Sequence, residues 1–303
     1  MLLLWSGIGD ALREAAAALP VLPLTIAVHA GQLFLSALAW RSLLDRVVGP
    51  GTAFRVRVVR EGVDSLLPVA QVGGEILAVG LLARRGVAPA LAGAGTALDL
   101  LTEGATLPVV ILLGLGTLWL LGGDVRALPA VLAAVALGIA GAAGFALAQR
   151  LGLLRLIEAI ARRLPPAMRV DGLHQALLAR ARNRRALGWA SLLHVAAWSG
   201  GAFEVWLAMW ALGHSVGIGP AFVIESLGMA ARGAGFAVPG ALGVQEGGFV
   251  AAAALFGIPP DTALALSALK RVREVAVGLV GLALWRMERV GSKPLPPLGE
   301  AGR

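Results

Sequence analysis

Charged and amide side chains stand inside apolar stretches of this sequence, where they could do chemistry. Glu75 follows a pair of glycines and Glu246 precedes another pair, so both carboxylates lie where a helix is easily interrupted. An ionised side chain at mid-membrane depth costs about 2.5–3.5 kcal/mol, so it needs a partner or a function. Such a carboxylate could bind a cation, carry a proton or hold a polar group. The residues assigned to this candidate site are Pro68, Gln71, Gly73, Gly74, Glu75, Pro239, Gln245, Glu246, Gly247 and Gly248.

A second set of charged residues is assigned to ion pairing or gating. Asp99 is placed opposite Lys270 by the sequence repeat described below, and Glu61 opposite Arg232. A structural interpretation stays open for these pairs, because buried ion pairs can fix how two halves of a protein pack. The glycines beside the carboxylates could likewise serve close packing alone. The full set is Arg60, Glu61, Asp64, Asp99, Glu103, Arg232, Lys270, Arg271, Arg273 and Glu274.

Both sets belong to a stretch that occurs twice. Residues 61–103 align with residues 232–274 without a gap, at a constant offset of 171 positions (239 minus 68). The matched pairs are Pro68 with Pro239, Glu75 with Glu246, Gly86 with Gly257, Pro89 with Pro260, and Glu103 with Glu274. A shared helix break, a shared carboxylate and a shared Gly-apolar-x-Pro turn in one register indicate an internal duplication.

The composition places the chain in the membrane class. Of its 303 residues, 58% are hydrophobic and only 15% are charged, and the mean hydropathy is +0.81. The absence of cysteine excludes disulfides, thiolate metal sites and cysteine nucleophiles. No phosphate-binding loop, dinucleotide fingerprint or metal-binding histidine spacing occurs, so we expect no cofactor and no metal. The net charge of +8 comes from arginines between apolar segments, which indicates membrane topology and not nucleic-acid binding.

The apolar pattern predicts an all-α polytopic membrane protein. Residues 2–19 are typical of an interfacial amphipathic helix. Crossings are expected at residues 20–44, 89–121, 128–148, 186–212 and 262–285. The apolar pieces of each repeat are shorter than the ~20 residues of a crossing and are broken by Pro68 or Pro239. Because Arg55, Arg57 and Arg60 form a basic end before the first copy, and Arg84 and Arg85 another after it, a re-entrant hairpin is predicted.

Positive charge sets the predicted orientation. The basic stretch 150–185 is expected in the cytoplasm together with the C-terminus, and the N-terminus is expected outside. The two hairpins then enter from opposite sides, which predicts two inverted-topology repeats, an architecture typical of transporters. The predicted organisation is a single membrane domain 1–303 with repeat one (20–121), a linker helix and basic loop (127–185), repeat two (186–290) and a disordered tail (291–303).

Three motifs carry a family resemblance. They are the run Arg60-Glu61-Gly62 … Leu67-Pro68-Val69-Ala70-Gln71-Val72-Gly73-Gly74-Glu75, its counterpart Pro239-Gly240 … Gly243-Val244-Gln245-Glu246-Gly247-Gly248, and Lys270-Arg271-Val272-Arg273-Glu274. The chain resembles the hopanoid-biosynthesis-associated membrane proteins, over roughly residues 5–289. These belong to the wider superfamily named for the flippase-like transmembrane region of lysylphosphatidylglycerol synthases. Many relatives carry a further N-terminal transmembrane helix, and this sequence is expected to start after it.

The resemblance implies a bacterial inner-membrane protein that handles hopanoids, their precursors or other polar lipids. Without the synthase's soluble domain, aminoacyl transfer is not implied. The predicted function is therefore a lipid flippase and not an enzyme, in which a headgroup passes through a Glu-lined cavity between the repeats. Protonation of Glu75 or Glu246 is a hypothesis for its coupling. The expected partners are membrane lipids and hopanoid-biosynthesis enzymes, with the oligomeric state left open.

Two alternative functions stay open. The first is a non-catalytic scaffold that docks hopanoid-biosynthesis enzymes through the basic 150–185 loop. The second is an intramembrane lipid-modifying enzyme, which is disfavoured because no nucleophile–base set is recognisable. His194 and Ser199 lie close in sequence, but no nucleophile motif surrounds them.

Overall fold

The structure, a computed structural model, describes residues 2–67, 73–122, 172–234, 241 and 243–290. In these residues the regular secondary structure consists of helices joined by turns. The helices are α1 (Leu2–Ala17), η1 (Leu19–Val21), α2 (Leu22–Leu43), α3 (Pro50–Leu66), α4 (Gly73–Ala83), α5 (Pro89–Leu120), α8 (Leu173–Ala181), α9 (Arg184–Ser199), α10 (Gly201–Ala211), α11 (Ile218–Ala234), α12 (Val244–Ala254) and α13 (Pro260–Val290). The predicted all-α class is confirmed for these residues. The predicted crossing 128–148, the tail 291–303, and Pro68, Gln71 and Pro239 lie outside the described residues.

Proline and glycine set the ends of the long helices. Pro89 and Pro260 are the first residues of α5 and α13, a position where the missing N–H of proline costs nothing. Gly86 and Gly257 adopt φ angles of 84° and 71° in the turns just before them, a conformation that glycine takes without strain. The Gly-apolar-x-Pro turn of each copy therefore ends one helix and prepares the next.

The helix bounds keep the spacing of the sequence repeat. α4 begins and ends 171 positions before α12 (244 minus 73, and 254 minus 83). α5 likewise begins 171 positions before α13 (260 minus 89). Each long helix is thus preceded, at the same distance along the chain, by a short helix, and the two short helices have 11 residues each.

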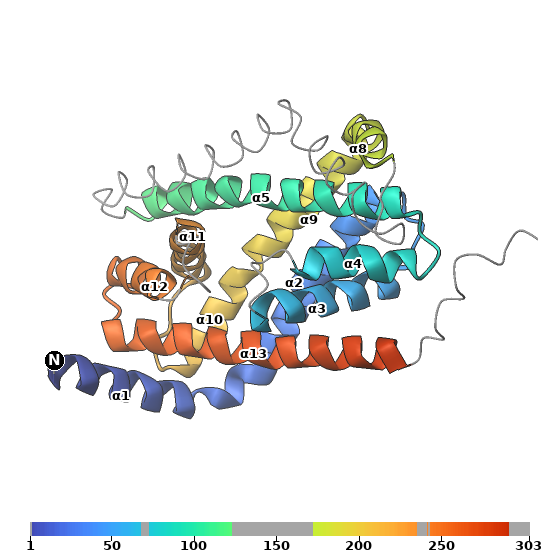
Figure 1. The fold of residues 1–303 in the computed structure, drawn as a ribbon. Helices are drawn as coiled ribbons and strands as arrows, with labels where there is room; N and C mark the ends of the chain where they lie inside the picture. Colours follow the sequence, from blue (N-terminus) through green and yellow to red (C-terminus); the bar gives the residue numbers. More distant parts are fainter. Residues whose placement is uncertain (1, 68–72, 123–171, 235–240, 242, 291–303) are drawn as a thin grey trace, which may run out of the picture.

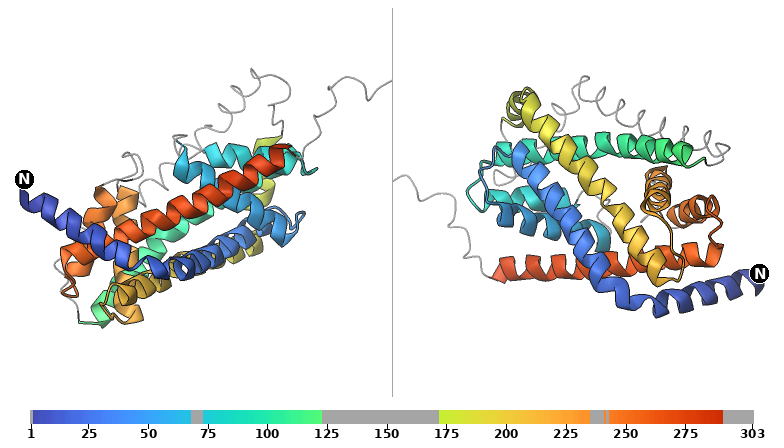
Figure 2. Two further views of the ribbon diagram at one scale, coloured as in Figure 1. Left: turned by 90° about the horizontal axis from the view of Figure 1, so that it is seen from below. Right: turned by 180° about the vertical axis from the view of Figure 1, so that it is seen from behind.

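The two long helices run in opposite directions along opposite sides of the bundle (Figure 1). The pair α3–α4 lies toward the start of α5, and the pair α11–α12 lies toward the start of α13 (Figure 1). α3 packs against α13, and α11 packs against α5, so each copy supports the long helix of the other. α2 and α9 lie side by side and cross the bundle between them (Figure 2).

Close helix packing and buried aromatic side chains hold this arrangement. A Cβ atom on Gly62 of α3 would lie 2.6 Å from the carbonyl oxygen of Gly278 on α13, so the two backbones can approach only because glycine stands there. Trp40 of α2 is fully buried, and its indole N–H donates to the Thr96 hydroxyl of α5 at 3.2 Å. These contacts fix the helices that carry the charged residues.

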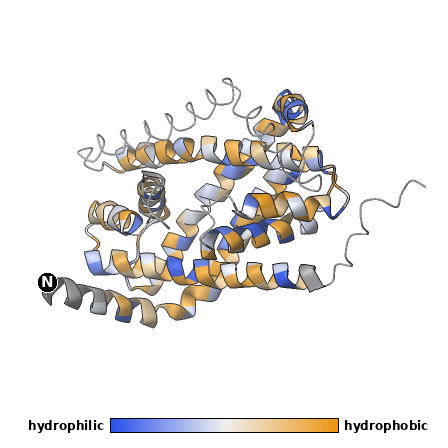
Figure 3. Ribbon diagram, in the orientation of Figure 1, coloured by the Kyte–Doolittle hydropathy of each residue, from blue (hydrophilic) through white to orange (hydrophobic). Residues whose placement is uncertain are grey.

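Among the described residues, three segments are long and apolar enough to cross a membrane. They are Leu19–Leu43, Pro89–Leu120 and Arg184–Ala211, which match the crossings predicted at 20–44, 89–121 and 186–212. α13 has 31 residues and covers the crossing predicted at 262–285, but it does not belong to this apolar group. Figure 3 shows the difference, since hydrophilic residues gather on the middle of α13 and on α3 while apolar residues dominate α4 and α5.

Candidate functional site

A buried network of opposite charges joins α3 to α5. Arg57 donates to Asp99 at 3.2 Å and to Glu103 at 2.5 Å. Arg60 donates to the same two carboxylates at 2.8 and 3.3 Å. The side chain of Asp99 is 0% exposed and that of Glu103 is 15% exposed. Each carboxylate therefore has two guanidinium partners away from solvent, which is a strong charge-assisted arrangement. The α3–α5 cluster, as named below, comprises Arg57, Arg60, Glu75, Asp99, Glu103 and His194.

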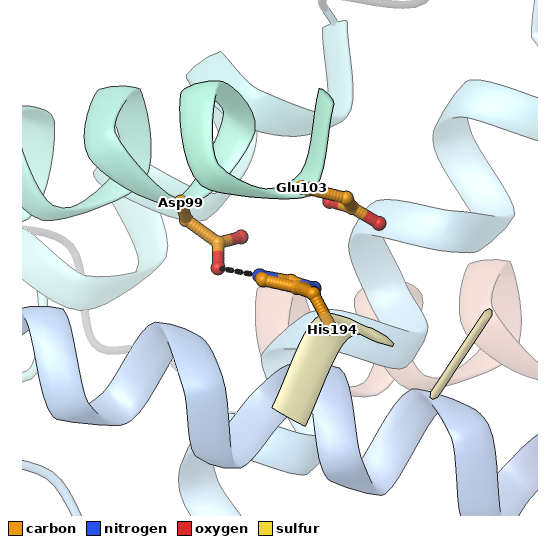
Figure 4. Close-up of side chains that lie close together, drawn as sticks. All are labelled: Asp99, Glu103 and His194. Carbon is orange, nitrogen blue, oxygen red and sulfur yellow. Dashed lines mark hydrogen bonds and ion pairs between the residues drawn. The ribbon is translucent and has the colours of Figure 1, made fainter. Parts of the chain in front are cut away.

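His194 of α9 adds a third partner to Asp99. Its Nε2 lies 2.9 Å from Asp99 Oδ1, and the imidazole is buried between α9 and α5 (Figure 4). Asp99, Glu103 and His194 each bring a ligand atom within 4.8 Å of the others, a spacing that a metal ion could use. Arg57 and Arg60 already bind both carboxylates, however, and two guanidiniums beside the site repel a divalent cation. We therefore assign the three residues to the ion-pair network.

Glu75 and Asp64 fasten α4 to α3. Glu75 is 8% exposed, and its carboxylate forms an ion pair with Arg60. Asp64, near the end of α3, accepts a hydrogen bond from the backbone N–H of Gly74 at 2.8 Å and so caps the start of α4. A Cβ atom on Gly74 would collide with this carboxylate. α4 is therefore held against α3 through both acidic residues.

A second cluster joins α11, α12 and α13 and is more exposed. Arg232 donates to Glu274 at 2.7 Å and to the side chain of Gln245 at 3.2 Å. Arg271 donates to Glu246 and to Glu274, in both cases at 3.2 Å. The side chains of Arg232, Arg271 and Glu246 are 38%, 25% and 23% exposed. Solvent-facing polar groups can exchange partners more easily than buried ones. The α11–α13 cluster comprises Arg232, Gln245, Glu246, Arg271 and Glu274.

Glu246 closes the start of its own helix. It is the third residue of α12, and its carboxylate accepts a hydrogen bond from the backbone N–H of Gly243 at 2.7 Å. The hydroxyl of Ser267 lies 3.4 Å from its other oxygen. Glu246 thus combines a capping role with its ion pair to Arg271, whereas in the first copy Asp64 caps the helix for Glu75.

A third group of charges gathers around Glu204 of α10. Gln32 and His29 of α2 approach its carboxylate at 2.5 and 3.2 Å, and Arg273 of α13 approaches at 3.4 Å. Glu204 is 2% exposed. Arg273 also lies 3.8 Å from Glu274, so this group is continuous with the α11–α13 cluster. The Glu204 group comprises His29, Gln32, Glu204, Glu225, Lys270 and Arg273.

The two ion pairs suggested by the repeat do not form. Asp99 binds the α3 arginines and a histidine, while Lys270 donates to Glu225 of α11 at 2.7 Å. Arg232 reaches a carboxylate of α13 and the amide of α12, and makes no ion pair with Glu61 among the described residues. The reason is the placement of α5 and α13 on opposite sides of the bundle, which separates positions equivalent in the repeat (Figure 1).

The interpretation of Arg57 and Arg60 as a basic surface end is also wrong. Both are only 5% exposed and turn inward to the carboxylates of α5. Arg55, which precedes both on α3, has a side chain that is 45% exposed, and it pairs with Glu288 of α13 at 3.4 Å. A guanidinium reaches far enough to cross between helices, so an arginine near an apolar segment need not mark the membrane surface.

The glycines beside the two carboxylates differ in their surroundings. Gly73 begins α4. Gly248 lies against Ala231 of α11 so closely that a Cβ atom would collide, as at Gly74. Gly247, in contrast, has no atom within 4 Å of the Cβ position. The close-packing interpretation therefore holds for Gly74 and Gly248.

Sequence reasoning did not assign several residues of these clusters. The sequence patterns give no site role to Arg57, His29 or His194, and they do not single out Glu204 or Glu225. Glu204 carried a usable signal, because it is an acidic residue inside a predicted crossing. His194 lies in the same predicted crossing and carried the same signal, but its partner Asp99 is 95 residues away in the chain and no local pattern indicates it.

One comparison with known proteins found a match. The family model described as "Lysylphosphatidylglycerol synthase TM region" matches residues 1–281. The comparisons with curated proteins and with solved structures found no match. The superfamily that the motifs indicated is confirmed, while the association with hopanoids stays a prediction.

Proposed function

The chain belongs to the family of lysylphosphatidylglycerol synthase transmembrane regions, and from this premise we propose that it moves polar lipids between the leaflets of a bacterial inner membrane. Membership supports a flippase-like, lipid-related membrane protein. In this proposal the lipid headgroup passes along the charged interior while the tails stay in the bilayer. Hopanoids and their precursors are among the candidate lipids. The protein carries out no covalent chemistry on them.

The observation that carries the proposal is the amount of charge inside an apolar bundle. Asp99 and Glu204 lie within segments that are apolar enough to span a membrane, yet each is at most 2% exposed. Each such charge costs about 2.5–3.5 kcal/mol on insertion, and intramembrane charges commonly mark a transport pathway. The clusters extend from α3 through α13 to α12. A polar headgroup that moved along this path would be solvated by their charged side chains.

The arrangement of the two copies supports inverted repeats. α5 and α13 run in opposite directions, and α3 and α11 each pack on the long helix of the other copy (Figure 1). We take α4 and α12 as the inner arms of two re-entrant hairpins, since each has 11 residues, about half of a crossing. Transporters of this kind place the substrate between such broken helices.

The α11–α13 cluster is the proposed headgroup site. Arg232 and Arg271 hold carboxylates but remain 38% and 25% exposed, so a phosphate could replace those carboxylates. Arg273 contributes a buried Nε atom with no hydrogen-bond partner among the described residues. In this scheme protonation of Glu246 removes one of the two carboxylates that hold Arg271, the other being Glu274, and so favours its exchange onto the lipid phosphate, which couples headgroup binding to a proton.

Lipid movement in proteoliposomes tests the proposal. Lipids with a fluorescent acyl chain are reconstituted with the full chain, and the fraction in each leaflet is measured with a membrane-impermeant quencher. We expect movement of at least one polar lipid by the wild type and its loss in the double variant Glu75→Gln/Glu246→Gln. If folded wild-type protein moves none of the tested lipids, the proposal is wrong.

A further inference from the structure

A basic pocket lies at one end of the bundle, apart from the three charged groups. The turn after α2 and the first turns of α9 enclose a volume of about 850 Å³. Two candidate membrane-spanning segments meet here, since one ends at Leu43 and the other begins at Arg184. Both ends lie beside α8 (Figure 2). If both segments span the membrane, a pocket at their ends lies at the level of the lipid headgroups.

The pocket carries an excess of positive charge. Arg46, Arg184 and Arg185 line it, and none of them has an ion-pair or hydrogen-bond partner for its side chain among the described residues. Asp45 also lines the pocket, but its carboxylate is paired with Arg180 of α8. Three guanidiniums thus stay available for an anion.

Hydrogen bonds fix the turn that carries Arg46 and tie it to α9. Asp45 and Arg46 adopt φ angles of 52° and 59°, a left-handed turn that few non-glycine residues take. The N–H of Arg46 donates to the Arg41 carbonyl at 2.9 Å, and the Arg41 side chain donates to the Val48 carbonyl at 2.7 Å. Ser42 reaches the carbonyl of Ala186 at 3.4 Å and joins the turn to α9.

An apolar strip continues from the arginines along α9. Arg185, Trp189 and Leu192 are spaced four and three residues apart, so they lie on one face of the helix. Trp189 is 50% exposed and Leu192 is 57% exposed. Charge at one end and exposed apolar surface at the other match an amphiphile and not a small soluble anion.

We propose that this pocket binds an anionic phospholipid, with its phosphate on the three arginines and one acyl chain along Trp189 and Leu192. Guanidiniums bind phosphate oxygens with paired, charge-assisted hydrogen bonds, and basic pockets between membrane helices are suited to anionic headgroups. The lipid held here is a fixed ligand at the membrane surface. The proposal does not depend on which lipid the protein moves, or on whether it moves any.

Native mass spectrometry of the full chain in detergent tests it, with phosphatidic acid as the probe. Wild type is compared with R46Q/R184Q/R185Q and with a control, R84Q/R182Q/R286Q, which removes the same charge from exposed arginines outside the pocket. We expect the pocket variant to bind phosphatidic acid about tenfold more weakly than wild type, and the control to match wild type. W189A/L192A should also weaken binding, because the acyl contact is lost.

Two competitors, one soluble and anionic and the other a lipid without net charge, identify the ligand class. Glycerol 3-phosphate carries the same headgroup without tails, and phosphatidylcholine carries the tails without net charge. Neither should displace phosphatidic acid at equal concentration. Equal binding by pocket and control variants, or displacement by either competitor, would overturn the proposal. Should the triple variant not fold, R46Q and R184Q/R185Q are measured separately by the same titration.

Discussion

Glu75 and Glu246 occupy equivalent places, and the structure uses them differently. Each is the third residue of an 11-residue helix, 171 positions apart (246 minus 75). Glu75 is paired to Arg60 in a cluster whose acidic side chains are 0–15% exposed. Glu246 caps its own helix, is 23% exposed and holds an arginine that is also partly exposed. The α3–α5 cluster is therefore buried, and we call it the locked cluster. The α11–α13 cluster is partly exposed, and we call it the open cluster.

The difference starts from two substitutions between the copies. The positions of Arg57 and Arg60 are taken in the second copy by Gly228 and Ala231 (228 minus 57, and 231 minus 60, both 171). α11 therefore cannot deliver two inward guanidiniums as α3 does. At Gly228 the ring of Phe249 packs into the space, since a Cβ atom there would collide with it. The two equivalent carboxylates of the duplication therefore lie in a buried and in a partly exposed ion-pair network.

The largest expected effect is the loss of Asp99, the centre of the locked cluster. Asp99→Asn leaves Arg57 and Arg60 with fewer negative partners in a fully buried site. Removing one partner of a buried ion pair costs about 3–5 kcal/mol. We expect a corresponding fall in unfolding stability, measured by thermal denaturation in detergent. Asp10→Asn on α1, where the side chain is 48% exposed, is the matched control and should change little.

An intermediate effect is expected in the access of small reagents to the two clusters. The chain has no cysteine, so single cysteines can be placed without a further background change. Glu246→Cys should react with a water-soluble thiol reagent faster than Glu75→Cys, because the side chains are 23% and 10% exposed. Mass spectrometry of the labelled protein gives both rates. Equal rates would remove the distinction between a locked and an open cluster.

The smallest effect is expected within the open cluster. Arg232 and Glu274 lie 2.7 Å apart, but Arg232 is 38% exposed, so solvent screens the pair. A double-mutant cycle with Arg232→Gln and Glu274→Gln should give a coupling energy of about 0.5–1 kcal/mol. A coupling several times larger, measured by thermal unfolding, would place this pair with the locked cluster.

The sequence predicted the helices better than it predicted their charged contacts. The crossing predicted from Pro89 begins there as α5, and the one predicted from residue 262 begins two residues earlier, at Pro260, because proline acts through the local backbone. The partner of Asp99 could not be found in this way. It depends on α9 and α3 meeting α5 in space, which no local pattern records, and on the reach of Arg57 and Arg60 across the bundle.

The repeat itself misled in one respect. It places Asp99 opposite Lys270 in register, but equivalent positions come together only where they lie near the axis that relates the two copies. In the fold these residues belong to helices on opposite sides, and each finds a partner on a neighbouring helix instead. Charge sign alone did not indicate which neighbour that would be.

The most direct test compares Glu75→Gln with Glu246→Gln in one experiment that measures both lipid movement in proteoliposomes and thermal stability. Glu75→Gln should lower stability by about 1–2 kcal/mol while lipid still moves, because Arg60 keeps its other carboxylates. Glu246→Gln should abolish movement and leave stability nearly unchanged. The opposite pattern, with Glu75→Gln abolishing movement and Glu246→Gln leaving it intact, would contradict the assignment of the open cluster as the headgroup site.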